Sequence, residues 1–223
     1  MIFQLKLNVI AKNATRFLQP LLSRATGLIQ VNNMTTANAC DQKGGKNTYM
    51  VWMDLEMTGL DIQKDKILEV SCLITDKDLN IQSNGLSFAI NHPQEVYEQM
   101  NEWCIKQHYA SGLVDSCKKS TVTPEAAEDL ILTYLKQNIP EKTCVLAGNS
   151  VYMDRLFLYK YMPIVNKYLH YRIVDVSTIK ELARRWNPDI IEKAPKKAFA
   201  HRSLDDIKDS IAELKFYKEH LFK

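Results

Sequence analysis

Two carboxylates stand two positions apart in an apolar segment of the chain. Asp54 and Glu56 belong to residues 48–60, a stretch of strand-forming side chains that breaks at Gly59. Side chains two apart on a strand face the same way, so the two carboxylates should lie side by side. In a buried strand this charge is costly unless cations neutralise it, and hard divalent metals bind carboxylate oxygens. The pattern indicates either a metal site or a strand that emerges at a sheet edge, with both carboxyl groups solvated or one of them protonated.

Three more residues could complete a metal site. Asp154 falls in the first turn of a helix opened by Asn149-Ser150. His201 and Asp206 stand five apart at the start of another helix. Each has an ordinary explanation, because an acid in a first turn stabilises the helix dipole and a lone histidine is more often a surface or capping residue. Their joint occurrence at the ends of separate elements of one α/β sheet favours a shared site, because functional sites gather there.

The order of strands and helices indicates how these residues are positioned. Three consecutive apolar runs joined by short turns predict an antiparallel meander. Helices follow, one of them with a clear start at Thr123-Pro124. The predicted strands are 48–60, 66–75, 81–90, 145–148 and 172–176, the predicted helices 94–109, 123–140, 151–162, 177–186 and 203–222, and the predicted loops 110–122 and 187–200. This order predicts one α/β domain with a mixed sheet and no internal repeat.

The composition is typical of a soluble globular protein. The chain has 223 residues, 46% of them hydrophobic and 25% charged, which is enough for one good-sized domain. No apolar run reaches the ~18 residues of a membrane-spanning helix, so no membrane association is expected. The five cysteines form no C-x-x-C pair. They indicate free thiols in a reducing compartment, with neither a disulfide framework nor a structural zinc site.

The net charge of +3 is unevenly distributed along the chain. Residues 1–40 contain four basic and no acidic side chains, so the remainder carries 25 basic and 26 acidic residues and is nearly neutral. Each neutralised phosphate of a nucleic acid needs a lysine or arginine, so no basic groove for a long polyanion is expected. Any nucleic-acid substrate should therefore be short.

The acid-free N-terminal segment is typical of a mitochondrial transit peptide. Residues 1–33 mix basic residues with leucine, isoleucine and phenylalanine, and lack the continuous apolar core of a secretory signal. The alternative is a disordered or domain-packed N-terminal arm. We predict location in the mitochondrial matrix, with a second start at Met34 giving an untargeted form in the cytoplasm or nucleus. Residues 34–47 are small and polar, and predict a flexible linker before an ordered domain at 48–223.

Three motifs, in order, resemble those of a known superfamily. Asp-x-Glu-x-Thr-Gly-Leu at 54–60, Asn-Ser-x-x-x-Asp-Arg at 149–155 and His-x-x-x-x-Asp at 201–206 are similar to the exonuclease motifs of the DEDDh superfamily. Longer signatures, such as Asp-Val-Ser-Thr-Ile-Lys-Glu-Leu-Ala-Arg-Arg-Trp at 175–186, resemble the oligoribonuclease family in particular. The similarity extends over about 49–222. It implies 3′–5′ exonuclease activity and a ribonuclease H-like α/β fold, in which helices flank a mixed five-stranded sheet.

By this resemblance, four carboxylates would hold two Mg²⁺ or Mn²⁺ ions about 4 Å apart, which activate water and stabilise the leaving oxygen. His201 would take the proton from the attacking water, and Tyr171 also belongs to the implied catalytic set. The product would be a nucleoside 5′-monophosphate released from the 3′ end. The implied metal ligands are Asp54, Glu56, Asp154 and Asp206.

The resemblance also implies how a short RNA is held. A leucine wedges between two bases and an aromatic residue stacks on one, at positions that match Leu60 and Trp103. A cap on the 5′ phosphate would select dinucleotides, because a longer chain would need the space that the cap fills. Without the resemblance, core packing is the simpler explanation for Trp103 and Tyr171. The implied cap residues are His108, Ser150, Tyr171 and Arg172, the last two contributed by the partner subunit of a homodimer.

The main prediction is a 3′–5′ exoribonuclease that hydrolyses short oligoribonucleotides, especially dinucleotides. One alternative is a related exonuclease acting on longer single-stranded RNA or DNA, which should have a basic channel. Another is a non-catalytic nucleic-acid-binding module on the same fold. Such a module would be expected to lack a carboxylate or the histidine of the site, and all five are present here.

Overall fold

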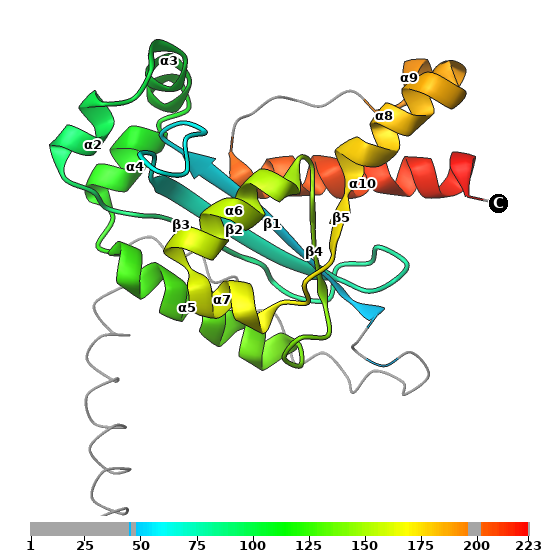
Figure 1. Cartoon of the computed structure of the whole chain (residues 1–223), viewed down its shortest axis with the longest axis horizontal. Coiled ribbons are helices and arrows are strands. Elements are labelled where there is room, and N and C mark those ends of the chain that lie inside the picture. Colours follow the sequence, from blue (N-terminus) through cyan, green and yellow to red (C-terminus); the bar gives the residue numbers. More distant parts are fainter. Residues whose placement is uncertain (1–44, 46–47, 196–201, 223) are drawn as a thin grey trace, which may run out of the picture. The chain divides into compact units, whose positions relative to one another are not determined.

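A mixed five-stranded sheet forms the centre of the fold (Figure 1). Its strands are β1 (Met50–Met57), β2 (Ile67–Thr75), β3 (Leu86–Ala89), β4 (Val145–Gly148) and β5 (Ile173–Asp175), in the order β3-β2-β1-β4-β5. β2 pairs antiparallel with β1 and β3, whereas β4 runs parallel to β1 and β5. The computed structural model describes residues 45, 48–195 and 202–222. The predicted α/β architecture, an antiparallel meander joined to parallel strands, is confirmed.

β1 is the middle strand, and its side chains alternate between the two faces of the sheet. Val51 and Met53 pack into one apolar core, while Trp52 packs into a second core on the other face. Asp54 and Glu56 follow Trp52 at two-residue intervals and therefore belong to its face. β1 lies between β2 and β4, so the alternative of an edge strand is wrong, although Asp54 and Glu56 follow the three residues that pair with β4. Protonation of one carboxyl, the other part of that alternative, agrees with the raised pKa of Glu56.

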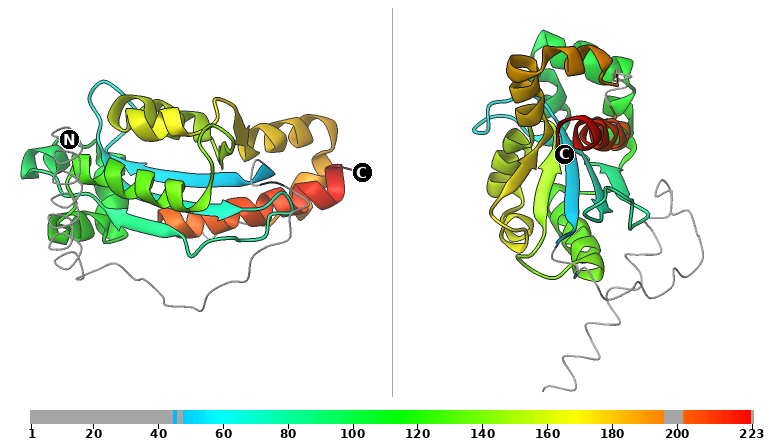
Figure 2. Two further views of the ribbon diagram at one scale, coloured as in Figure 1. Left: turned by 90° about the horizontal axis from the view of Figure 1, so that it is seen from below. Right: turned by 90° about the vertical axis from the view of Figure 1, so that its right-hand side faces the viewer.

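Helices cover both faces of the sheet (Figure 2). The core around Met53 includes Ile131, Phe157 and Val165 from three helices on that face, which are α5 (Pro124–Asn138), α6 (Val151–Tyr161) and α7 (Pro163–Tyr168). The core around Trp52 includes Ile207. The helices of that second core are α8 (Val176–Trp186) and α10 (Ser203–Leu221).

A third, smaller core joins β2 to the helices that follow β3. Leu68 of β2 packs with Tyr97, Cys104 and Leu113, all of them almost fully buried. These three residues belong to α2 (Gln94–Glu98), α3 (Glu102–Ala110) and α4 (Leu113–Lys119). The small core brings α3 close to the end of β1, as the hydrogen bond from His108 to the carbonyl oxygen of Met57 shows.

Four predicted element boundaries are wrong. The predicted helix 94–109 is two helices, α2 and α3, because Asn101 caps a new helix by accepting a hydrogen bond from Cys104 N. The predicted loop 110–122 contains α4, and the predicted loop 187–200 contains α9 (Pro188–Lys193). The predicted strand 81–90 is shorter, because β3 spans Leu86–Ala89. The predicted helix 151–162 does end before Pro163, which then begins α7. Helices of six or seven residues span too few turns for hydrophobic spacing to be recognised.

The two predicted helix caps have different outcomes. Thr123 accepts a hydrogen bond from Ala126 N and Pro124 opens α5, as expected. Ser150 precedes α6 in a left-handed conformation (φ 52°) and makes no side-chain cap bond. Its backbone N–H instead donates to Asp175 Oδ1 and Ser177 Oγ. The prediction that Asn149-Ser150 caps this helix is therefore wrong for the Ser150 side chain.

Four of the five cysteines lie among the described residues. Cys72, Cys104, Cys117 and Cys144 are buried free thiols, and Cys40 lies outside the described residues. Among the described helices, none is both long and apolar enough to cross a bilayer. The predicted transit peptide, 1–33, also lies outside the described residues, as does all of the predicted linker 34–47 except residue 45.

Candidate functional site

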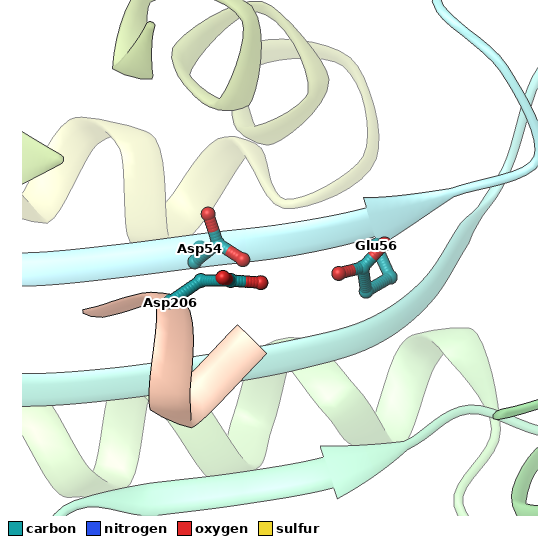
Figure 3. Close-up of side chains that lie close together, drawn as sticks. All are labelled: Asp54, Glu56 and Asp206. Carbon is teal, nitrogen blue, oxygen red and sulfur yellow. The ribbon is translucent and has the colours of Figure 1, made fainter. Parts of the chain in front are cut away.

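Three carboxylates meet on the Trp52 face of the sheet, under the start of α10 (Figure 3). Asp54 and Glu56 come from β1, and Asp206 comes from the first turn of α10. Each offers one oxygen, and these oxygens all lie within 4.8 Å of one another. Positions 150 residues apart in sequence thus converge because α10 packs its apolar side on the face that Asp54 and Glu56 share.

The donor set fits a hard divalent cation. All three groups are carboxylates, which Mg²⁺ and Mn²⁺ prefer over nitrogen or sulfur ligands. Each is partly buried, so the charges are poorly screened by water. An arrangement that gathers negative oxygens at low exposure is costly by itself and becomes favourable when a cation binds.

Asp154 lies beside this cluster rather than within it. Its side chain is 6% exposed, and Oδ1 accepts a hydrogen bond from Leu55 N at 2.9 Å. It is close enough to help raise the pKa of Glu56. Of the four predicted metal ligands, the structure therefore brings Asp54, Glu56 and Asp206 together. The fourth, Asp154, is held next to them by its hydrogen bond with the backbone of β1.

Burial and mutual repulsion raise the pKa values of two of these carboxyls. The pKa of Glu56 rises to about 8, mainly because the group is buried, and further because Glu69, Asp206 and Asp154 are negative neighbours; Arg202 opposes the shift. The pKa of Asp154 rises to about 7, again mainly through burial. Without a cation, protons compensate the charge near neutral pH, and a divalent ion would displace them.

His108 is buried against the end of β1. Its side chain is 2% exposed, and Nε2 donates a hydrogen bond to the carbonyl oxygen of Met57 at 2.8 Å. Nδ1 lies 3.9 Å from Glu56 Oε2. In this arrangement the predicted phosphate-cap residue faces the acidic cluster, and its role at a 5′ phosphate stays a prediction.

The two residues predicted to contact bases are large apolar side chains that face solvent. Leu60 is 66% exposed and Trp103 is 60% exposed. Leu60 lies in the loop after β1, three positions beyond Met57, and Trp103 lies in the first turn of α3. Core packing, the simpler alternative for Trp103, is therefore wrong, because more than half of the side chain is available to a ligand.

The loop that carries Leu60 is fixed by side-chain hydrogen bonds. Asp65 accepts from Thr58 Oγ1 through Oδ1 and from Asp61 N through Oδ2, both at 2.8 Å. A Cβ on Gly59 would collide with the Asp65 carboxylate, which explains why the turn has glycine there. From α6, Lys160 Nζ donates to the carbonyl oxygens of residues 62 and 63. The sequence did not single out Asp65 or Lys160, because their partners are set by the shape of the loop.

The remaining predicted cap residues lie at the surface near β5. Tyr171 is 72% exposed, which excludes core packing. Its ring stacks on His170 at 4.5 Å between centroids, and the Arg172 guanidinium carbon lies 5.2 Å from its centroid. Ser150 is exposed, with its Oγ 3.3 Å from Ser177 Oγ. These positions do not join the acidic cluster, and their contact with substrate stays a prediction.

The predicted general base, His201, lies outside the described residues. The next residue, Arg202, is described and donates through Nη2 to Glu69 Oε1 of β2 at 2.8 Å. Glu69 was not among the predicted site residues. Its only sequence signal is a lone acid inside the apolar strand 67–75, which is buried throughout its nine residues.

Comparisons with known proteins show what this chain is similar to. A family model described as Exonuclease (RNase_T) matches residues 51–214. A probable oligoribonuclease of Drosophila melanogaster is 68% identical over 179 residues, which cover 80% of this chain and 85% of that protein. The mitochondrial oligoribonuclease of Homo sapiens is 55% identical over 174 residues, covering 78% and 73%. The oligoribonuclease of Haemophilus ducreyi is 50% identical over 177 residues, covering 79% and 96%.

Solved structures show the same fold at low sequence identity. Zinc-bound E. coli exonuclease I in complex with single-stranded DNA superposes with a TM-score of 0.62 and 14% identity, covering 78% of this chain and 41% of that chain. Exonuclease I from Methylocaldum szegediense gives a TM-score of 0.58 and 17% identity, with the same coverage. This chain therefore matches less than half of those longer proteins, and the likeness concerns the fold alone.

Proposed function

The chain belongs to the exonuclease (RNase_T) family and, within it, to the oligoribonucleases. On this basis we propose a role for each of its site residues. The chain is a 3′–5′ exoribonuclease that acts on short oligoribonucleotides. The observation that carries our assignment is the convergence of Asp54, Glu56 and Asp206 within 4.8 Å. It supports the ligand roles, whereas the proton-transfer and substrate roles rest on the resemblance to the family.

Enzymes of this family use divalent metal ions, and the acidic cluster is where this chain would hold them. Asp54, Glu56 and Asp206 provide the first ligands, and Asp154 completes the set with the carboxylate oxygen that Leu55 N does not occupy. When bound, two Mg²⁺ or Mn²⁺ ions supply an activated water and stabilise the leaving oxygen. The raised pKa of Glu56 supports this role, because it reflects charge that the protein leaves uncompensated.

We assign proton transfer to His201, which immediately precedes Arg202 at the start of α10. An imidazole has an ordinary pKa near ~6.5 and can accept the proton of the attacking water at neutral pH. Tyr171 joins the catalytic set from the partner subunit. The product is a nucleoside 5′-monophosphate cleaved from the 3′ end.

We propose that dinucleotides are the preferred substrate. Leu60 would wedge between the two bases, and Trp103 would stack on one of them, which is worth about 1–3 kcal/mol per base. Their exposure of 66% and 60% supports this role, because both side chains are accessible to a ligand. The 5′ phosphate would be capped by His108, Ser150, Tyr171 and Arg172.

We propose that the active form is a homodimer. Tyr152, Leu156 and Tyr159 are spaced four and three residues apart on α6, so they share one face of that helix. They are 54%, 41% and 72% exposed, and Ile164 of α7 adds a further exposed apolar side chain. An exposed apolar stripe of this kind fits the surface of a second copy, which would bring its own Tyr171 to the first site.

Mitochondrial relatives support a mitochondrial location for this chain. We propose the matrix as the compartment and residues 1–33 as the targeting segment. A start at Met34 would yield a form in the cytoplasm or nucleus. Expression of the whole chain and of a chain starting at Met34, each with a C-terminal fluorescent tag, would test this, since only the former should co-localise with a matrix marker.

The test of the substrate proposal is turnover against chain length. Nucleotide release from 5′-labelled RNA of two to about ten nucleotides should be fastest for the dinucleotide in Mn²⁺ and should stop in chelator. Asp54→Ala should abolish release at every length. Equal or faster release from the longest RNA or from DNA would instead favour an exonuclease of long single strands. Binding without any release would indicate a non-catalytic module.

A further inference from the structure

We propose that Glu69 is a positioning residue for the metal site, acting through the start of α10. The proposal rests on the proposed function, because it takes Asp206 to be a metal ligand. Glu69 lies on β2 directly opposite Glu56 on β1. It is 2% exposed and does not belong to the cluster of three carboxylates. Glu69 is therefore a negative neighbour of Glu56 outside the ligand set, and it acts on Asp206 through the start of α10.

Both carboxylate oxygens of Glu69 bind residues at the start of α10. Oε1 accepts a hydrogen bond from Arg202 Nη2 at 2.8 Å. Oε2 accepts from Ser203 N at 3.2 Å and from Ser203 Oγ at 2.7 Å. The cap residue of α10, Arg202, makes no side-chain cap bond of its own. Glu69 therefore performs the capping from a neighbouring strand, which ties the helix to the sheet.

The hydrogen bonds to Glu69 restrict the position of Asp206, the residue that completes the acidic cluster. Asp206 lies in the same first turn, and its N–H donates to Arg202 O at 3.1 Å. Because the first turn is fixed, α10 can neither shift along its axis nor rotate much relative to β1, and the position of the Asp206 side chain is restricted. Ser71 of β2 adds a further contact, with its Oγ 2.6 Å from Ser203 Oγ. Two neighbouring positions of the sheet thus hold the helix that delivers Asp206.

Fold stability alone does not account for a carboxylate at this place. Like charges directly opposite each other across two strands repel, and Glu69 opposes Glu56 in the register. Burial of Glu69 at 2% exposure removes the screening that water would provide. The Arg202 ion pair compensates part of this cost. We therefore infer that the arrangement serves to fix the position of α10, and with it the position of Asp206.

The experiment compares Mn²⁺ binding and turnover in Glu69→Gln with those of the wild-type full chain. Calorimetric titration with Mn²⁺ should show a dissociation constant raised by about 10- to 100-fold, and kcat on a dinucleotide should fall by a similar factor. The KM for the dinucleotide should change by no more than about twofold, because Leu60 and Trp103 lie on other elements. A general loss of folded protein would lower the number of active sites without changing the Mn²⁺ affinity of those that remain.

Glu128→Gln is the matched control. Glu128 is also a carboxylate that caps a neighbouring helix, accepting from the backbone N–H groups of Ile164 and Val165 at the start of α7. Glu128 lies on α5, on the opposite face of the sheet from the acidic cluster. The Mn²⁺ affinity and kcat of Glu128→Gln should therefore match those of wild type. Ser203→Ala removes the hydroxyl bonds to Glu69 and Ser71 and keeps the Glu69 bonds from Ser203 N and Arg202. It should shift both quantities in the same direction as Glu69→Gln, which keeps the test available if the latter does not fold.

Two outcomes overturn the proposal separately from its premise. If Asp206→Asn weakens Mn²⁺ binding while Glu69→Gln and Ser203→Ala bind Mn²⁺ like wild type, Glu69 does not position the site. The same holds if Glu69→Gln and Glu128→Gln lose activity equally. If Asp206→Asn itself binds Mn²⁺ like wild type, the ligand role assigned under the proposed function is wrong.

Discussion

Replacing Glu56 with glutamine should stabilise the metal-free protein at neutral and alkaline pH while removing its activity. Burial and three negative neighbours raise the pKa of Glu56 from 4.5 to about 8. A carboxyl whose pKa is higher in the folded than in the unfolded state holds more protons when folded, so its contribution to stability decreases as pH rises between these two values. Glutamine carries no proton to lose and keeps the size of the protonated side chain.

The size of the effect follows from the pKa shift. Between pH 4 and pH 7, the free energy of unfolding should fall by about 3 kcal/mol, because Glu56 ionises in the unfolded state while it stays mainly protonated in the folded state, and each pKa unit corresponds to somewhat more than 1 kcal/mol. The side chain is only 15% exposed, so solvent screening reduces this little. For a domain of this size, about 3 kcal/mol corresponds to a change of roughly 6–12 °C in the midpoint of thermal unfolding.

The assay is thermal unfolding followed by circular dichroism from pH 5 to pH 8, with chelator or with Mn²⁺. In chelator, the midpoint of wild type should fall with pH and that of Glu56→Gln should fall much less, so the variant is the more stable protein at pH 8. Mn²⁺ should raise the wild-type midpoint most at high pH and should do little for the variant. Trp103→Ala, which alters no carboxyl, should keep the wild-type slope. An equal slope for Glu56→Gln and wild type in chelator would refute the reasoning.

Three further substitutions test the substrate and subunit contacts. Trp103→Ala should raise the KM for a dinucleotide by about 5- to 150-fold, equivalent to the loss of ~1–3 kcal/mol of stacking, with little change in kcat; an unchanged KM would show that this side chain does not touch the base. Asp65→Asn removes one hydrogen-bond acceptor from the loop that carries Leu60, which should destabilise the folded conformation of that loop by about 1 kcal/mol. The KM for a dinucleotide should therefore rise several-fold, and equal KM values for wild type and variant would contradict this. Tyr159→Lys places a charge in the apolar stripe of α6 and should shift sedimentation towards monomer with loss of dinucleotide affinity; a fully active monomer would argue against the dimer.

The central part of the site could be predicted because it depends on local periodicity. Asp54 and Glu56 share a face for the same reason that Val51 and Met53 share the other, and alternation on a strand is visible in sequence. Asp206 could be placed in a first turn from the helix signal alone. That it meets Asp54 follows from the packing of α10, which the sequence indicated only through motif resemblance.

The rest of the site could not be predicted because it depends on tertiary contacts. Nothing in the sequence around Glu69 shows that its partners lie at residues 202 and 203, 133 and 134 positions away. His108 was implied by the resemblance, but its burial at 2% exposure could not be read from the sequence, because it depends on the packing of α3 against the end of β1. The short helices α4 and α9 were missed for a different reason, since six or seven residues give too weak a periodic signal.

The burial of the cysteines determines how readily the protein is oxidised under oxidative stress. Burial raises the pKa of the Cys117 thiol to about 12 and also raises the pKa values of Cys72, Cys104 and Cys144. Peroxide attacks the thiolate, which is scarce at such pKa values and lies out of reach inside a packed core. These four sulfur atoms should therefore stay reduced in the presence of peroxide, and their oxidation should not limit RNA degradation by this domain.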